Sequence, residues 1–173
     1  MSYLVIIRGP LGVGKTTVSK TLAKKLGALY VSIDEVLNEN SLDQIDEKEG
    51  GISVKSFLKG NEIVLPEIRQ ALQSDRTVVI DGCFYHKEQI QHFLDHLEAE
   101  SHVFTLKAPV ETCIGRDAER KKTYGEDAAR AVHMFVSKFD YGTVIDTEGK
   151  TLKDTISEIF QQLPGTSFFR GKS

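Results

Sequence analysis

The sequence of 173 residues predicts an α/β fold in which helices cover both faces of a five-stranded parallel sheet. Three observations predict it. Short runs rich in β-branched residues alternate with helical patterns, the helical patterns repeat apolar residues every three or four positions, and a glycine-rich loop joins the first run to the first helix. We therefore expect three layers, with the sheet between two layers of helices.

Five apolar runs are the predicted strands, at residues 3–8, 29–33, 77–81, 103–107 and 143–146. Helices are predicted between them, the first at 17–26 and a long one around 54–72. Three later helices each gather their apolar residues on one face: Ile90, Phe93, Leu94 and Leu97; Val132, Phe135, Val136 and Phe139; Ile156, Ile159, Phe160 and Leu163. Strands separated by helices indicate parallel pairing.

Helix boundaries and interruptions are also marked in the sequence. Pro109 with Glu111 marks a helix start, and Thr151 with Asp154 forms a variant of the capping box. Two stretches break the alternation of strands and helices. Residues 35–51 are acidic and polar and are expected to form a loop or short helix, and residues 116–127 are dense in charge and contain Gly125. Such irregular segments are where substrate-facing, moving parts are expected, the first within an insertion over 35–72 and the second as a lid.

Length and composition limit the class of protein. We expect one domain over residues 1–173, because this length suits one core. The net charge of −3 argues against broad binding to nucleic acid or to anionic membranes, so nucleic acid is expected only as a substrate. The first apolar run is too short for a signal peptide or membrane span, which predicts a cytoplasmic protein. Cys83 and Cys113 are expected to be buried free thiols.

The strongest motif is the segment GPLGVGKT at residues 9–16, which matches the phosphate-binding loop pattern G-x-x-x-x-G-K-[ST]. Glycines permit backbone dihedrals that other residues avoid, so successive N–H groups can turn inward around an oxyanion. The helix that follows points its positive end at the same place. A chance glycine-rich turn is the alternative, and the strand before the loop and the helix after it argue against that alternative.

The loop predicts a nucleoside triphosphate as ligand. Lys15 would reach the β- and γ-phosphates, and the Thr16 hydroxyl would be a ligand of the Mg²⁺ that bridges them. We therefore expect ATP and Mg²⁺ as cofactors, with the nucleotide bound by these residues: Gly9, Leu11, Gly12, Val13, Gly14, Lys15, Thr16 and Thr17.

Two carboxylates follow predicted strands and are expected at the same edge of the sheet as the loop. Asp34 ends the second strand, where it could accept the proton of an attacking hydroxyl or orient it. The alternative for Asp34 is a helix N-cap. Asp81 ends the buried strand TVVID, a pattern typical of the acid that holds Mg²⁺ directly or through water, and Gly82 would let a substrate approach the backbone.

Arginines form the third group of candidates. Arg116 and Arg120 are four residues apart and share a helix face, and Arg130 follows the charged break. Guanidinium groups match the charge that spreads over a phosphoryl group during its transfer, so Arg116 and Arg120 are candidate catalytic residues of a lid. A solvated helix surface is the alternative, because Asp117 and Glu119 alternate with the basic residues.

With these residues in place, the chain from Tyr3 to about Leu163 resembles the small P-loop kinases of the nucleoside monophosphate kinase-like superfamily. The segment APVETCIGRD at residues 108–117 and the segment VIDT at 144–147 are most similar to the adenylylsulfate, gluconate and polynucleotide kinase branch. The resemblance implies a strand order of 2-3-1-4-5. It also implies that Arg116 lies near the adenine and phosphates, that Arg120 contacts the transferred phosphate, that Asp34 meets the acceptor hydroxyl, and that residues 147–150 pass the adenine edge.

The acceptor is less well defined than the donor. The arginine-rich signature that binds shikimate is absent, and residues 35–69 match no acceptor site of the family. We expect a small-molecule or nucleotide acceptor, bound by Asp34, Arg69, Asp81, Gly82 and Arg130. The acidic stretch 35–49 makes a polyanionic acceptor such as DNA or RNA less favourable.

The predicted activity is transfer of the γ-phosphate of ATP to a hydroxyl or phosphate group. Three alternatives stay open: a polynucleotide 5′-hydroxyl kinase, a nucleotide-binding regulator without transfer activity, and a GTPase. The GTPase hypothesis depends on the segment SKFD at residues 137–140 and on a D-x-x-G segment at 146–149. These two segments occur in the reverse of the order that GTPases have. The sequence allows a monomer or a homodimer. Phe168 and Phe169 in the tail are expected to dock on the body or on a second subunit.

Overall fold

A computed structural model describes residues 2–119 and 124–165 of the chain. Its main sheet has five strands, β1 (Leu4–Arg8), β2 (Leu29–Ser32), β5 (Val78–Gly82), β6 (Ser101–Lys107) and β7 (Thr143–Asp146). The order across the sheet is β2-β5-β1-β6-β7, and every neighbouring pair is parallel. The predicted five-stranded parallel sheet is therefore confirmed, with its order of 2-3-1-4-5 among these five strands.

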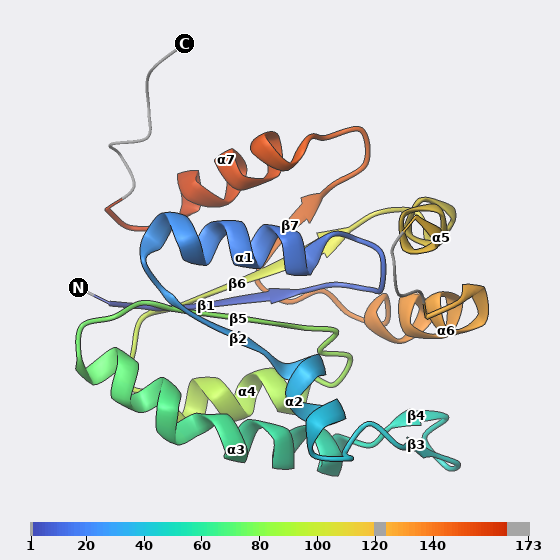
Figure 1. Ribbon diagram of the computed structural model, residues 1–173, viewed down its shortest axis with the longest axis horizontal. Helices are drawn as coiled ribbons and strands as arrows, with labels where there is room; N and C mark the ends of the chain where they lie inside the picture. The colour runs from blue at the N-terminus through green and yellow to red at the C-terminus, as the bar shows by residue number, and fades with distance from the viewer. Residues whose placement is uncertain (1, 120–123, 166–173) are drawn as a thin grey trace.

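Helices cover both faces of this sheet (Figure 1). On one face lie α1 (Lys15–Leu26) and α7 (Leu152–Gln162), and on the other lie α3 (Val54–Gln73) and α4 (Lys87–His96). Three more helices stand near the carboxyl ends of the strands: α2 (Ile33–Glu39), α5 (Val110–Ala118) and α6 (Glu126–Val136). The loop between β1 and α1 lies at this same edge, so the elements near it are the ones that can form a site around it.

The central strand β1 shows why both faces need helices. Its alternate residues Leu4 and Ile6 belong to the apolar core on the side of α3 and α4, whereas Val5 and Ile7 belong to the core beneath α1 and α7. All four side chains are fully buried. A strand buried on both faces reads as a continuous apolar run, which is why the sequence indicated it so clearly.

The stretch that broke the predicted alternation is partly ordered. It contains α2 and then a short antiparallel hairpin of β3 (Ile45–Asp46) and β4 (Gly51–Ile52). The Asp46 carboxylate accepts hydrogen bonds from the backbone N–H groups of Lys48 and Glu49, which fixes the turn. Sequence periodicity could not predict strands of two residues, because one alternation of side chains gives no pattern.

Strand ends differ from the predicted ends by one or two residues. The strand β2 ends at Ser32, one residue before the predicted end, because the Ser32 hydroxyl accepts a hydrogen bond from the Glu35 N–H and caps α2. The capping box of α7 is present as predicted, with reciprocal bonds between Thr151 and Asp154.

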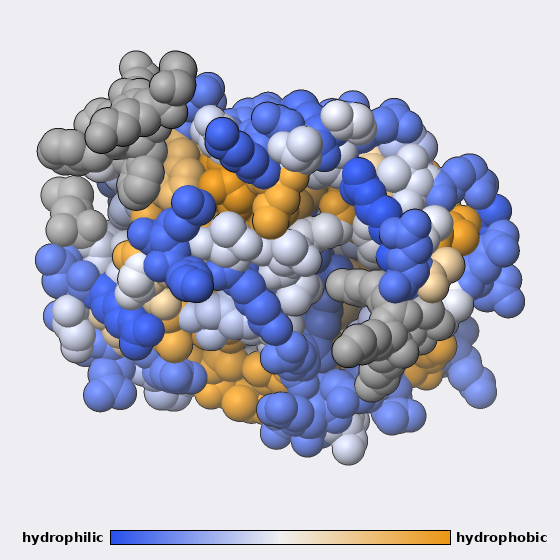
Figure 2. All heavy atoms as spheres, turned by 45° about the horizontal axis from the view of Figure 1, so that its top comes forward, coloured by the Kyte–Doolittle hydropathy of each residue, from blue (hydrophilic) through white to orange (hydrophobic). Residues whose placement is uncertain are grey.

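Charged and polar side chains cover most of the face in Figure 2, and apolar side chains reach that surface in separate patches between them. Within the described ranges, no helix combines the length and the apolar character needed to cross a membrane. The predicted contact of Phe168 and Phe169 lies outside the described residues.

Candidate active site

Two glycines give the loop after β1 its shape. Gly12 and Gly14 have φ angles of 78° and 98°, in the left-handed region that favours glycine, and Gly14 immediately precedes α1. A side chain on Gly12 would also overlap the carbonyl group of Cys113 in α5. The loop therefore has a fixed conformation and packs closely against α5, while the first N–H groups of α1 point toward any anion bound there.

Lys15 is the first residue of α1 and is buried, with only 6% of its surface exposed. Its Nζ lies 3.6 Å from Oδ2 of Asp34. Burial alone lowers the pKa of Lys15, but the neighbouring carboxylates of Asp34 and Asp81 outweigh burial and raise its pKa above the ordinary value. The lysine is thus a fixed positive charge at the mouth of the loop.

Asp81 lies at the end of β5 and is completely buried. Burial raises its pKa to about 6 against the opposing charge of Lys15, and the nearby Asp34 carboxylate adds to the rise. Its Oδ2 accepts a hydrogen bond from the Tyr30 hydroxyl at 3.2 Å, whereas its Oδ1 is buried with no hydrogen-bond partner among the described residues. A buried carboxylate oxygen without a partner is costly unless a ligand, water or cation completes the site.

Asp34 lies in the first turn of α2, and its side chain is 29% exposed. The alternative role of Asp34 as a helix N-cap is wrong, because Ser32 caps that helix. Its Oδ1 instead accepts a hydrogen bond from the Cys83 N–H at 3.2 Å, and its Oδ2 accepts one from the Cys83 thiol at 3.5 Å. Asp34 is therefore held in place by the segment after β5 while one side of its carboxylate stays open to solvent.

Cys83 is buried and free, as expected, but the sequence did not indicate its contact with Asp34. Burial and the neighbouring Asp34 carboxylate raise the pKa of the thiol to about 12, so Cys83 stays protonated and donates. Gly82, which precedes it, packs tightly: a Cβ there would lie 3.0 Å from the Phe84 ring and 3.2 Å from the Ile33 side chain. Packing alone thus accounts for glycine at position 82.

Arg116 lies on α5 and joins the loop to the segment after β7. Its guanidinium group donates to the Val13 carbonyl at 3.2 Å and to the hydroxyl and carbonyl oxygens of Thr147 at 3.0 and 3.1 Å. Arg120, its predicted catalytic partner, lies outside the described residues. Arg130 on α6 is half-exposed and bonds to the carboxylates of Glu111 and Glu126 at 2.9 and 2.8 Å, which ties α5 to α6.

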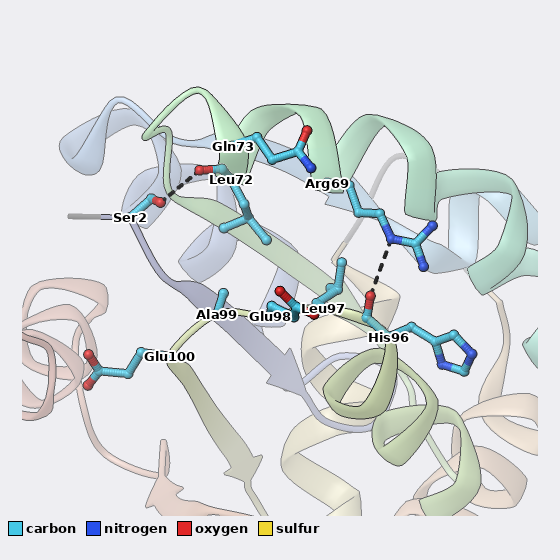
Figure 3. A pocket seen from close by; sticks show the side chains of 9 residues that line it. All are labelled: Ser2, Arg69, Leu72, Gln73, His96, Leu97, Glu98, Ala99 and Glu100. Carbon is cyan, nitrogen blue, oxygen red and sulfur yellow. Dashed lines mark hydrogen bonds between the residues drawn. The ribbon is translucent and has the colours of Figure 1, made fainter.

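The structure does not bring Arg69 to the loop. Arg69 lies in the second half of α3, at the opposite edge of the sheet, and its Nε donates to the His96 carbonyl at 3.3 Å. It lines a pocket of about 640 Å³ that also includes Ser2 and Glu100, residues just before β1 and β6 (Figure 3). The expectation that Arg69 binds the acceptor is therefore wrong, because the ligand-binding edge lies at the other ends of these strands. The periodicity of the sequence predicted that Arg69 lies on a helix, but it could not predict which edge of the sheet Arg69 lies near.

Sequence reasoning missed Arg8, the last residue of β1. Arg8 is fully buried and makes five hydrogen bonds, to the carbonyl oxygens of Phe84, Val136 and Phe139 and to the Thr105 hydroxyl. Burial lowers its pKa to about 10. The side chain therefore connects the strand before the loop with the segment after β5 and with the end of α6. The available signal was a charged residue that ends an otherwise apolar strand.

The segment 137–140, considered above as a guanine-reading motif, follows α6 directly. Asp140 forms an ion pair with Lys107 at 2.6 Å, at the end of β6. This ion pair gives Asp140 a structural role within the chain, in place of the guanine contact that the GTPase interpretation would assign to it.

Comparison with known proteins adds to this geometry. The chain matches the model of a family described as AAA domain over residues 4–138. A protein from Thermococcus kodakarensis named "Putative adenylate kinase" is 30% identical over 167 residues, which cover 90% of this chain and 82% of that protein.

Two solved structures are similar over most of the chain. A sugar kinase from Janibacter sp. superposes with a TM-score of 0.76 at 13% identity, over 93% of this chain and 94% of the other. A gluconokinase from Sinorhizobium meliloti superposes with a TM-score of 0.65 at 12% identity, over 90% and 88%. At these identities the likeness to the two structures concerns the fold alone.

Proposed function

Because the chain belongs to the AAA domain family and is a P-loop kinase of the nucleoside monophosphate kinase-like superfamily, we propose that it transfers the γ-phosphoryl group of ATP to a hydroxyl group of a small acceptor. The observation that carries this proposal is the meeting of Lys15, Asp34 and Asp81 beside the glycine-rich loop. One cation and two carboxylates at that position supply a phosphate contact, an acceptor contact and a candidate metal ligand.

The donor is bound by the loop and the start of α1. The backbone N–H groups of residues 11–16 would surround the β-phosphate, and Lys15 would reach the β- and γ-phosphates as a point charge. Lys15 is within 3.6 Å of Asp34 before any ligand arrives. Bound ATP would give this ammonium group a further anionic partner beside its carboxylates, with the γ-phosphate next to the acceptor carboxylate of Asp34. Leu11 and Val13 are buried and give the loop an apolar support, and Thr17 is exposed on the first turn of the helix.

Thr16 and Asp81 are the residues that would hold Mg²⁺. The buried and unpartnered Oδ1 of Asp81 fits a cation or its bound water, because Mg²⁺ prefers carboxylate and hydroxyl oxygens. A bound cation supplies charge neutralisation between the phosphates. It would also keep Asp81 ionised, since positive charge offsets the burial that raises the pKa of Asp81 to about 6.

Asp34 contacts the acceptor in this proposal. Its carboxylate is fixed by Cys83 on one side and is 29% exposed, so a hydroxyl group can approach it from the open side. The carboxylate orients that hydroxyl or takes its proton as the phosphorus–oxygen bond forms. The Lys15 ammonium group lies 3.6 Å from Oδ2 of the same carboxylate, so the acceptor hydroxyl and the γ-phosphate would meet beside it.

The segment 116–127 is the proposed lid over ATP, and Arg116, Arg120 and Arg130 are its proposed phosphate or nucleotide contacts. Arg116 already bridges the loop and Thr147, so it supports the donor side as a strut between α5 and β7. Arg130 would have to exchange its two glutamate partners for a phosphoryl group. Closure of a lid excludes water and suppresses hydrolysis of ATP.

A second candidate is transfer to the phosphate group of a nucleoside monophosphate, because the relative from Thermococcus kodakarensis carries the name of an adenylate kinase. A polynucleotide 5′-hydroxyl kinase and a regulator that binds ATP without transfer are the further alternatives. All of them share the donor site, so a test of the proposal must follow the phosphoryl group to its acceptor.

Labelled ATP and a panel of hydroxyl compounds, nucleosides, nucleotides and 5′-hydroxyl oligonucleotides test the function. We expect the wild type to label one class of acceptor. Labelling should fall at least 100-fold in Lys15→Ala, because the lysine stabilises the negative charge on the phosphoryl group during its transfer. Lys24→Ala is the matched control, because Lys24 lies in the last turn of the same helix and is exposed. Tight ATP binding without labelling of any acceptor would favour the regulator instead.

A further inference from the structure

We propose that the acceptor carries no phosphate or carboxylate group and is an uncharged or amine-bearing hydroxyl compound. This inference rests on the proposed function and names the substrate class of the same site. It separates hydroxyl compounds of this class from nucleotides, phosphosugars and sugar acids. The argument depends on where the charged side chains of the acceptor side lie.

No guanidinium group is unpaired on the acceptor side among the described residues, and Arg130, an expected acceptor contact, is held by the carboxylates of Glu111 and Glu126. Residues 28–100 contain two arginines, Arg69 and Arg76. Arg69 donates to the His96 carbonyl, and Arg76 donates to the carbonyls of Gly27 and Ala28 at 3.4 and 3.2 Å. Both therefore stabilise the edge of the sheet opposite to the loop. A planar guanidinium fork is the group that best binds a phosphate or carboxylate, so this side lacks the usual anion receptor.

Two lysines beside the site, Lys15 and Lys20, are already matched by negative charge. Lys15 faces both Asp34 and Asp81, and the γ-phosphate of the donor would add more negative charge beside it. Lys20 lies 3.9 Å from the Glu35 carboxylate. A second anionic group brought in by the acceptor would thus meet two carboxylates and a triphosphate, against the positive charges of Lys15 and of the Mg²⁺ proposed at Asp81.

The segment that follows Asp34 adds further negative charge. Residues 34–53 contain one lysine, Lys48, and seven carboxylates: Asp34, Glu35, Glu39, Asp43, Asp46, Glu47 and Glu49. The hydrogen bonds that hold them come largely from neutral groups. Asp46 accepts from backbone amides, Glu49 accepts from the Val54 N–H, and Asp43 accepts from the Asn38 amide. Neutral donors order these carboxylates and leave their charge in place.

This acidic segment is fixed next to the catalytic residues. The Tyr85 hydroxyl accepts a hydrogen bond from the Ile52 N–H at 2.8 Å, and the His86 ring bonds to the Ile52 carbonyl at 3.0 Å. Gly51 packs closely on α6, since a Cβ there would lie 3.1 Å from the Phe135 ring. Tyr85 and His86 follow Cys83, which holds Asp34. Both ends of the segment are therefore tied to the loop after β5, and its β3–β4 hairpin lies below α6 in Figure 1.

Matched acceptors test this inference. We would compare glucose, gluconate and glucosamine, and adenosine with AMP, by labelled transfer from ATP and by calorimetric binding in the presence of a non-hydrolysable ATP analogue. The expected result is that each anionic compound has a kcat/KM, or a binding constant, at least tenfold below that of its uncharged or amine-bearing counterpart. Equal or better use of gluconate or AMP would overturn the inference while leaving phosphotransfer intact. Transfer to none of the compounds in a broader screen, anionic ones included, would overturn the proposed function.

A charge variant provides an independent check. Glu35→Gln removes one carboxylate beside Asp34, whereas Glu98→Gln removes one at the opposite edge of the sheet, in the pocket of Figure 3. We expect Glu35→Gln to raise the KM of an amine-bearing acceptor about twofold to fivefold at low salt. The variant should also lower the ratio of kcat/KM for adenosine to kcat/KM for AMP. Glu98→Gln should change neither quantity. Equal effects of the two variants would contradict a local electrostatic selection.

Discussion

Replacement of Asp81 by asparagine is expected to stabilise the ligand-free protein while abolishing phosphotransfer. Asp81 is completely buried, and its pKa is about 6 in the fold against an ordinary value of 3.8. The unfolded chain therefore loses this proton more readily than the folded chain does, so ionisation of Asp81 destabilises the fold as the pH rises. The contribution is favourable to the fold below pH 3.8 and is lost as the pH rises through 6.

The difference between the two pKa values sets the size of the effect. A difference of about 2 between the pKa values of Asp81 in the folded and unfolded states corresponds to about 3 kcal/mol of lost stability once the pH exceeds 7, and to about half of that near pH 5. An asparagine side chain has no charge to bury and can still accept the Tyr30 hydroxyl bond. Because Lys15 loses one of its two carboxylate partners in this variant, the measured gain should lie at about 1–3 kcal/mol.

Urea denaturation at pH 5, 6, 7 and 8, without nucleotide or Mg²⁺, measures this gain. Asp95→Asn is the matched control, since Asp95 is an exposed aspartate of α4 whose carboxylate accepts a hydrogen bond from the Gln91 side chain. The gain for Asp81→Asn should grow from pH 5 to pH 7, and the control should show none. A loss of stability in Asp81→Asn at pH 8, or a gain of the same size at every pH, would refute the argument that burial of an ionised Asp81 destabilises the site.

Three further substitutions follow from the contacts of the site. Asp34→Asn should lower kcat at least tenfold and leave the Kd for ATP within about twofold, because Asp34 faces the acceptor; an unchanged kcat would assign it a structural role only. Arg8→Met should lower the free energy of unfolding by about 3 kcal/mol or more, because three backbone carbonyls lose their donor; a change below about 1 kcal/mol by urea titration would contradict this. Gly12→Ala should weaken ATP binding more than tenfold, since a Cβ overlaps the Cys113 carbonyl and φ is 78°. Gly115→Ala, where a Cβ meets nothing within 4 Å, is its calorimetric control, and equal affinities of the two variants would exclude the steric reason.

The sequence predicted those parts of the molecule that depend on local pattern. Strands buried on both faces and helices with one apolar face are visible as periodicity, and the loop at residues 9–16 has a fixed spacing. The meeting of Asp34 and Asp81 followed from a topological rule, because the carboxyl ends of parallel strands share one edge. Both residues were predictable for that reason.

Contacts between distant segments were not predictable from such patterns. The error at Arg69 arose because a 20-residue helix runs the full depth of the sheet, and periodicity does not say which end of it meets the ligand-binding edge. The hydrogen bonds of Arg8 reach residues 76 to 131 positions away, and no local pattern encodes them. The hydrogen bond from the Cys83 thiol to Asp34 is a further contact of this kind, since a single cysteine in a sequence does not indicate which residue it will contact.

The most direct test of the central claim follows the labelled γ-phosphate of ATP into its product. The account predicts that the wild type places the label on a hydroxyl group of an acceptor without phosphate or carboxylate, forming one ADP per labelled acceptor, and that Lys15→Ala lowers this transfer at least 100-fold. Label found solely in inorganic phosphate with every acceptor, or transfer that survives in Lys15→Ala, would contradict the account.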